Sequence, residues 1–130
     1  MAYLANSELC PPAGFSGCIA AFSINSGALT FLGAFPPVGQ ISPVVVMAVD
    51  PDLVYVAASA SVAGYKIAST TTGALDQIAP PIPVTERTEG ATVDPDAAHL
   101  FTVNCEPQKG SSICLNATIS SFEIGSGGGA

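Results

Sequence analysis

Apolar residues occur along this chain in short runs that turn-forming residues separate. The runs VVVMAVD (44–50), LVYVAAS (53–59) and AGYKIAS (63–69) have the length and the β-branched content of strands, and Asp, Pro, Gly and Ser lie between them. Apolar residues do not recur every three or four positions with capping signals over a stretch long enough for a helix of ten or more residues. The pattern predicts an all-β protein with little or no helix.

The strand pattern repeats. Val-Asp-Pro-Asp occurs at Val49 to Asp52 and again at Val93 to Asp96, about 44 positions later, and an apolar strand follows each copy. A further strand ending in aromatic-x-Ile occurs three times, as FSI (22–24), YKI (65–67) and FEI (122–124). The unit is therefore a meander of four antiparallel strands, with Asp-Pro-Asp in its first turn and Thr-Gly or Ser-Gly in its third.

A four-stranded unit of about 40 to 50 residues is typical of a β-propeller blade. The order apolar strand, D-P-D, L-x-Y-V-A, aromatic-x-Ile and T/S-G-A-L resembles the blades of lactonase-type propellers, the family that contains bacterial 6-phosphogluconolactonase. The resemblance covers most of the chain, roughly residues 2–124. It implies an all-β fold of four-stranded antiparallel meander repeats of the propeller-blade type, forming an incomplete propeller.

The repeat also predicts the domain limits. Residues 2–7 match a second strand, a third and a fourth follow, residues 44–79 form a complete unit, and residues 90–124 supply strands one to three. We expect one repeat domain at 1–124, about two and a half blades, and a Gly-rich tail at 125–130. Such a chain is expected to be a fragment, a truncated homologue, or a protomer that completes its sheets with another chain.

Alternation within the strands predicts the core. The residues expected between the sheets are Val45, Met47, Val54, Val56, Tyr65, Ile67, Phe22, Ile24, Leu100, Val103, Phe122 and Ile124.

The chain carries a formal net charge of −7 with Lys66, Arg87 and Lys109 as its cations. A nucleic-acid binder needs a basic surface, so nucleic acid is excluded as a partner, and anionic membrane surfaces are disfavoured for the same reason. The longest apolar stretch, 43–49, is too short to span a bilayer. No secretory signal opens the sequence, so we expect any such signal to have been removed.

The cysteines indicate the compartment. Cys10 and Cys18 flank one loop between second and third strands, and Cys105 and Cys114 flank the equivalent loop of another unit. Equal repeat position and similar spacing predict the local disulfides Cys10–Cys18 and Cys105–Cys114 and an extracellular or secreted protein. Free thiols are the alternative, and a zinc site is disfavoured because neither pair has C-x2-4-C spacing. Asn116, in Asn-Ala-Thr, is a candidate glycosylation site expected in the second loop.

Candidate catalytic chemistry is scarce. His99 is read as a surface residue at a strand end, and the Asp-Pro-Asp carboxylates as turn formers that accept from backbone N–H groups. We expect no catalytic residue, no metal and no cofactor. Glu86, Arg87 and Glu89 form a charged cluster in the linker into the next unit, which the family resemblance would place at the mouth of a channel. A solvated connecting loop is the alternative.

Two functions are consistent with these patterns. The first is a secreted, non-enzymatic β-repeat module that acts in self-assembly or binding through its strand edges and loops, as a homo-oligomeric ring or filament. The alternative is a fragment of a lactone-hydrolysing or sugar-acid propeller enzyme whose remaining blades lie elsewhere. The small number of charged residues expected at the channel mouth favours the first function.

Overall fold

The structure, a computed structural model, describes residues 1–10, 15–36, 43–50, 52–111 and 113–125, and for residues 6–10, 15–16, 43–50 and 107 it describes the backbone alone. Every described residue lies in a strand, a turn or an irregular segment, and none is helical. The prediction of an all-β protein is confirmed.

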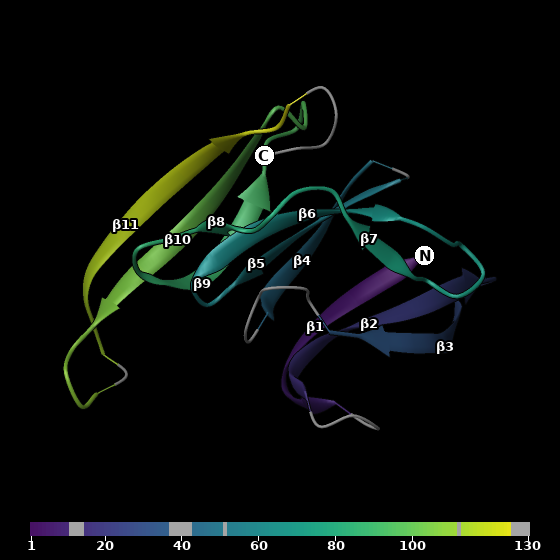
Figure 1. Ribbon diagram of the computed structural model, residues 1–130, viewed down its shortest axis with the longest axis horizontal. Helices are drawn as coiled ribbons and strands as arrows, with labels where there is room; N and C mark the ends of the chain where they lie inside the picture. Colours follow the sequence, from purple (N-terminus) through teal and green to yellow (C-terminus); the bar gives the residue numbers. More distant parts are fainter. Residues whose placement is uncertain (11–14, 37–42, 51, 112, 126–130) are drawn as a thin grey trace.

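The strands form three antiparallel sheets (Figure 1). The first sheet contains β1 (Ala2–Cys10), β2 (Phe15–Asn25) and β3 (Ala28–Phe35). The central sheet contains β4 (Pro43–Asp50), β5 (Leu53–Ala58), β6 (Ser61–Ile67) and β7 (Leu75–Gln77), with the short β8 (Ile82–Pro83) also paired to β6. The third sheet contains β9 (Arg87–Val93), β10 (His99–Pro107) and β11 (Cys114–Glu123). This division agrees with the grouping of strands that the repeat predicted.

Two turns show why the strands reverse where they do. In the β9–β10 connection, Asp94 Oδ1 accepts hydrogen bonds from the backbone N–H of Ala98 (2.7 Å) and of His99 (3.1 Å), as expected for this turn. In the β2–β3 connection, Ser26 and Gly27 both have positive φ, 50° and 83°, the backbone of a tight two-residue hairpin. The Asp50 side chain and Pro51, in the other Asp-Pro-Asp turn, lie outside the described part.

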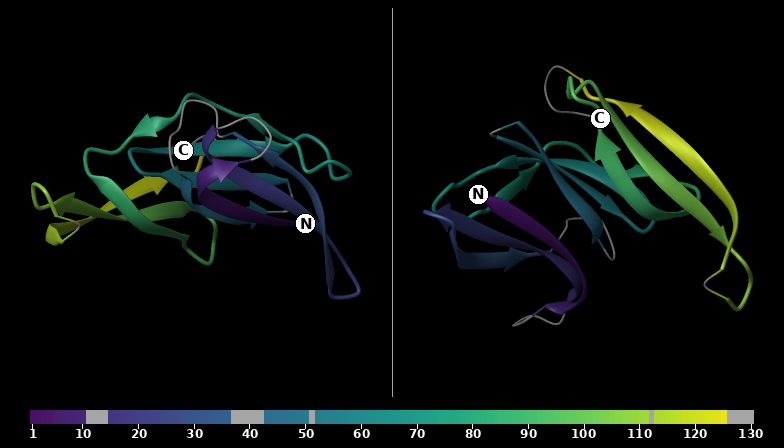
Figure 2. Two further views of the ribbon diagram at one scale, coloured as in Figure 1. Left: turned by 90° about the horizontal axis from the view of Figure 1, so that it is seen from below. Right: turned by 180° about the vertical axis from the view of Figure 1, so that it is seen from behind.

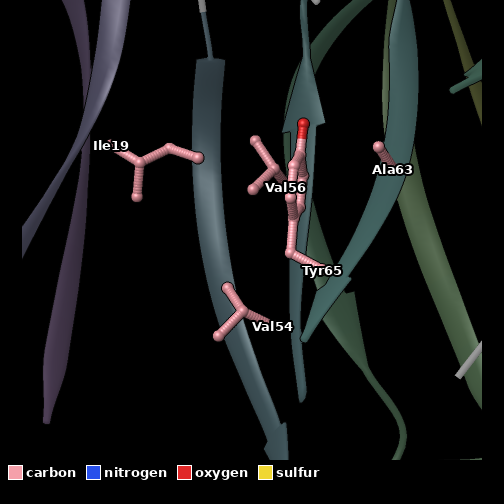
Figure 3. Packing of buried hydrophobic residues seen from close by; sticks show 5 residues of the cluster. All are labelled: Ile19, Val54, Val56, Ala63 and Tyr65. Atoms are coloured by element: carbon pink, nitrogen blue, oxygen red, sulfur yellow. The ribbon is translucent and has the colours of Figure 1, made fainter. Parts of the chain in front are cut away.

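The central sheet lies between the other two (Figures 1 and 2) and is buried on both faces. On one face, Ile19 of the first sheet points toward a cluster of central-sheet residues (Figure 3), made of Val54, Val56, Ala63 and Tyr65. On the other face, Leu100 of the third sheet packs with Tyr55, Ala57 and Val62. The strands alternate, so β5 and β6 supply apolar side chains to both contacts.

The predicted core is correct for its central part. Val54, Val56, Tyr65 and Leu100 are buried, and Ile67, Phe122 and Ile124 pack partly buried against the two clusters. The prediction is wrong for Ile24 and Val103, which are 54% and 46% exposed. Both lie on an outer sheet, on the face that points away from the central sheet. The Val45 and Met47 side chains lie outside the described part, and Phe22 is half-buried.

Within the described residues the three sheets fan out without closing into a ring (Figure 2). The structure therefore establishes antiparallel meander sheets, whereas the propeller and the domain limits at 124 and 125 remain predictions.

Candidate functional site

One strand of each outer sheet has an open edge at the position where the equivalent strand of the central sheet has a neighbour. Among the strands that the structure describes, β1 and β11 each pair with one strand, whereas their repeat equivalents β5 and β6 are paired on both sides. Neither edge strand contains Lys or Pro, the residues that commonly block edge pairing. These edges present unpaired backbone N–H and C=O groups to a partner.

The loop between β10 and β11 is closed by a disulfide. Cys105 and Cys114 are bonded, with their Cα atoms 5.5 Å apart, as predicted. Cys105 is buried and Cys114 is exposed. Cys18 is also disulfide-bonded, whereas its predicted partner, Cys10, has a side chain outside the described part. The bond agrees with an extracellular location.

Asn116 lies on β11 and not in the loop where the sequence reading placed it. Its Nδ2 donates a hydrogen bond to Glu106 Oε2 at 2.9 Å, across the β10–β11 pair. The residue is exposed, so the sequon is accessible, but its amide is already engaged by a carboxylate. The expected loop position was wrong because strand pairing continues past Cys105 to Pro107, which pairs with Cys114.

The charged cluster is divided between two sets of contacts. Arg87 Nε lies 2.6 Å from Glu89 Oε1, and both residues are on β9 rather than in a linker. Glu86 Oε2 accepts a 2.6 Å hydrogen bond from Thr118 Oγ1 of β11. The exposed Arg87–Glu89 pair and the Glu86–Thr118 bond engage these groups in and beside the third sheet, and their assignment to a channel mouth stays a prediction.

His99 forms a pair with the turn carboxylate. His99 Nδ1 lies 2.9 Å from Asp94 Oδ2, and this side-chain hydrogen bond, followed by the backbone N–H of His99, holds the pKa of Asp94 below its ordinary value. The histidine is exposed at the start of β10, as expected. The pair fixes the hairpin that leads into β10.

A row of buried polar side chains crosses the third sheet, and the sequence reading missed it. Thr88 Oγ1 donates to Asn104 Oδ1 (3.4 Å), and Asn104 Nδ2 donates to Ser120 Oγ (2.8 Å). Thr102 Oγ1, on the same face, has no partner. Polar residues at alternate positions of HLFTVN were the available signal, but alternation alone does not tell which face is buried.

Large apolar side chains are exposed on both outer sheets, a second feature that the sequence reading missed. Those on the first sheet are Leu4, Ile24, Leu29 and Phe31, and those in and beside the third are Val103, Ile113, Leu115 and Ile119. The number of predicted units was the available signal. Three stacked sheets make two contacts, so one apolar face of each outer sheet stays uncovered.

In the described ranges, no group of three or more His, Cys, Asp or Glu side chains could hold a metal ion. The same part of the chain has no helix that is long and apolar enough to cross a membrane. No protein-family model, curated protein or solved structure matches the chain. The lactonase-type resemblance therefore stays a prediction.

Proposed function

We propose that this chain is an extracellular, non-enzymatic β-repeat module that assembles or binds through its open sheet edges. One observation carries the proposal. In the described part of the chain, β1 and β11 are unblocked edge strands, although their equivalents in the central sheet, β5 and β6, are paired on both sides. An edge of this kind is a template for a strand from another chain. The Cys105–Cys114 bond supports an oxidising location.

The two edges differ in sequence and in repeat position, so a contact that joins them runs head to tail. Head-to-tail contacts give a ring when the rotation closes and a filament when it does not. The contacts of Glu86, Arg87 and Glu89 within one sheet offer no support for the lactone-hydrolysing alternative.

Proline scanning of the β11 edge tests the proposal. Along an antiparallel edge strand, successive N–H groups point alternately to the neighbour and to the open side, so Ala117→Pro and Thr118→Pro differ in which N–H is lost. The substitution that removes the inward N–H should lower the melting temperature. The other should keep the fold and reduce the molar mass in solution under non-reducing conditions. Unchanged mass in the stably folded variant would contradict edge pairing.

A further inference from the structure

The three sheets present equivalent faces, which the strand registers define. In the first sheet, Tyr3 pairs with Ala21 and Ala5 pairs with Ile19. The equivalent pairs of the central sheet are Tyr55 with Gly64 and Ala57 with Val62. Those of the third sheet are Phe101 with Ser121 and Val103 with Ile119. We call the face that carries these pairs the leading face. The opposite, trailing face carries the aromatic-x-Ile residues, which are Phe22 and Ile24, Tyr65 and Ile67, and Phe122 and Ile124.

Both contacts inside the molecule join a leading face to a trailing face. The leading face of the first sheet, with Tyr3 and Ile19, packs on the trailing face of the central sheet, with Tyr65 and Ile67. The leading face of the central sheet packs in the same way on the trailing face of the third, where Tyr55 and Val62 meet Leu100, Phe122 and Ile124. The repeat thus has one mode of sheet stacking, used twice.

One leading face and one trailing face remain uncovered. On the leading face of the third sheet, Ile119 is 74% exposed, although its equivalents Ile19 and Val62 are buried. On the trailing face of the first sheet, Ile24 is 54% exposed and Phe31, which contacts the Phe22 ring edge-on, is 59% exposed. Contiguous exposed apolar side chains of this kind mark interaction surfaces.

A turn also leaves room for the same stacking. Gly73 lies in the turn before β7, and a Cβ at this position would clash with the Ala21 side chain on the leading face of the first sheet. Gly27 occupies the same repeat position in the first unit, and a Cβ there would meet nothing within 4 Å. Gly73 allows the first sheet to approach the central unit closely. Gly27 would allow another sheet to approach the first unit in the same way.

We infer that the leading face of the third sheet packs on the trailing face of the first sheet of a second copy of this chain. Ile119 and Phe101 of one copy lie against Phe22 and Ile24 of the next, as Ile19 and Tyr3 lie against Tyr65 and Ile67 within a copy. The inference rests on the proposed self-assembly and deepens it, because it names a second copy as the partner and a sheet face as its contact. The third and first sheets that stack in this way are not also paired edge to edge. The partner follows from the two internal contacts, in which a trailing face of this repeat covers each leading face.

Charge permits this contact. The trailing-face residues of the first sheet that the structure describes are uncharged. On the leading face of the third sheet, His99 and Glu123 lie opposite each other at one end of the strands, and Arg87, opposite Cys105 toward the other end, is bonded to Glu89. The middle of this face, with Phe101, Val103 and Ile119, is apolar.

Two charge substitutions and a mixing experiment test the inference. Ile119→Asp places a carboxylate on the leading face, Ile24→Asp places one on the trailing face, and Ala79→Asp adds the same charge to an exposed loop of the central unit as a control. Sedimentation velocity at tens of micromolar, under non-reducing conditions, should show self-association of the intact chain and of the control. Each face variant should associate at least about 100-fold more weakly, because a carboxylate is buried without a partner.

The mixture decides whether the contact runs head to tail. A copy with Ile119→Asp keeps its trailing face, and a copy with Ile24→Asp keeps its leading face, so the equimolar mixture should form two-chain species although each variant alone is monomeric. Melting temperatures close to that of the intact chain would show that both variants fold. Association of Ile119→Asp alone would overturn the head-to-tail contact.

The inference and the proposed function fail in different ways. If both face variants assemble like the intact chain while the β11 proline variant does not, the face contact is wrong and the edge proposal stands. If the face variants dissociate and the proline variant does not, the edge proposal is wrong and the face contact stands. A monomeric intact chain at the same concentration would overturn self-association by either surface.

Discussion

The two contacts of the central sheet differ in the trailing face that takes part in each. Toward the first sheet, the trailing face of β5 offers Val54 and Val56, and the contact is apolar. At the equivalent positions of β10, the third sheet has Leu100 and Thr102, followed by Asn104. The same repeat position is thus aliphatic in one contact and polar in the other, although both are fully buried.

The difference shows how a polar face can be buried without a polar partner. Thr88, Asn104 and Ser120 bond to one another across β9, β10 and β11, so their hydrogen bonds stay within one sheet. The central sheet can therefore cover them with apolar side chains at little cost, because desolvated groups that remain hydrogen-bonded avoid the main penalty. Thr102 is the exception, because its buried hydroxyl has no hydrogen-bond partner among the described residues.

Removing a large side chain from the apolar contact should have the largest effect. Tyr65 is 2% exposed, and Tyr65→Ala should lower the free energy of unfolding by about 3 to 5 kcal/mol through lost burial and an unfilled cavity. Phe22→Ala, at the same repeat position on the uncovered face, is the matched control and should cost less than about 1 kcal/mol in the monomer. Urea denaturation measures both, and equal losses would mean that the assigned faces are wrong.

Breaking the polar row should cost less. Asn104→Ala leaves the buried Thr88 hydroxyl without its acceptor and should lower the free energy of unfolding by about 2 kcal/mol. Ser120→Ala removes one bond at a half-buried position and serves as the control, with a smaller loss. An Asn104→Ala variant as stable as the intact chain would show that the row contributes nothing.

Exchanging the two kinds of residue sharpens the comparison. Thr102→Val makes the third sheet resemble the central one and should raise the free energy of unfolding by about 1 kcal/mol, because an unpartnered buried hydroxyl is removed. The reverse change at the equivalent position, Val56→Thr, should lower it by about 1 to 2 kcal/mol. Thermal and urea unfolding of the pair check the signs, and a loss of stability in Thr102→Val would contradict the unsatisfied hydroxyl.

The smallest effect concerns the hairpin that leads into the polar contact. The pKa of Asp94 is lowered from its ordinary value of 3.8, first by the His99 side chain. A carboxylate with a lowered folded pKa stabilises the fold above its unfolded pKa, and this stabilisation is lost as pH falls through the folded pKa. Asp94→Asn should therefore be less stable than the intact chain at pH 7, and the difference should shrink toward pH 2. A difference that is constant with pH would contradict the pairing, and Asp96→Asn is the control.

Much of this architecture follows from local sequence. Asp94 and the Ser26-Gly27 pair fix turns through backbone conformations and side-chain acceptors that few residues provide, and the similar cysteine spacing predicted the Cys105–Cys114 bond. These features depend on neighbours close in the chain, which is why a sequence pattern reveals them.

The misplaced residues depend on distant neighbours instead. Ile24 has the same motif as Ile67 and Ile124, and its exposure is decided by whether a sheet lies over it, which no local pattern states. Glu89 was placed in a linker, yet it lies on β9, where the register shifts between Gly90 and Thr88. The incomplete units predicted open strand edges, whereas the uncovered sheet faces appear only in three dimensions.

The unequal burial of the two bonded cysteines also has a chemical consequence. An attacking thiolate has access to the exposed Cys114, so the leaving group is the sulfur of the buried Cys105. The departing thiolate would carry its negative charge in a poorly solvated position, where charge is disfavoured, and thiol exchange is slow when the leaving group is a poor one. The β10–β11 loop should therefore be reduced slowly in the folded chain and much faster after unfolding, so that the rate of reduction reports how often the third sheet opens.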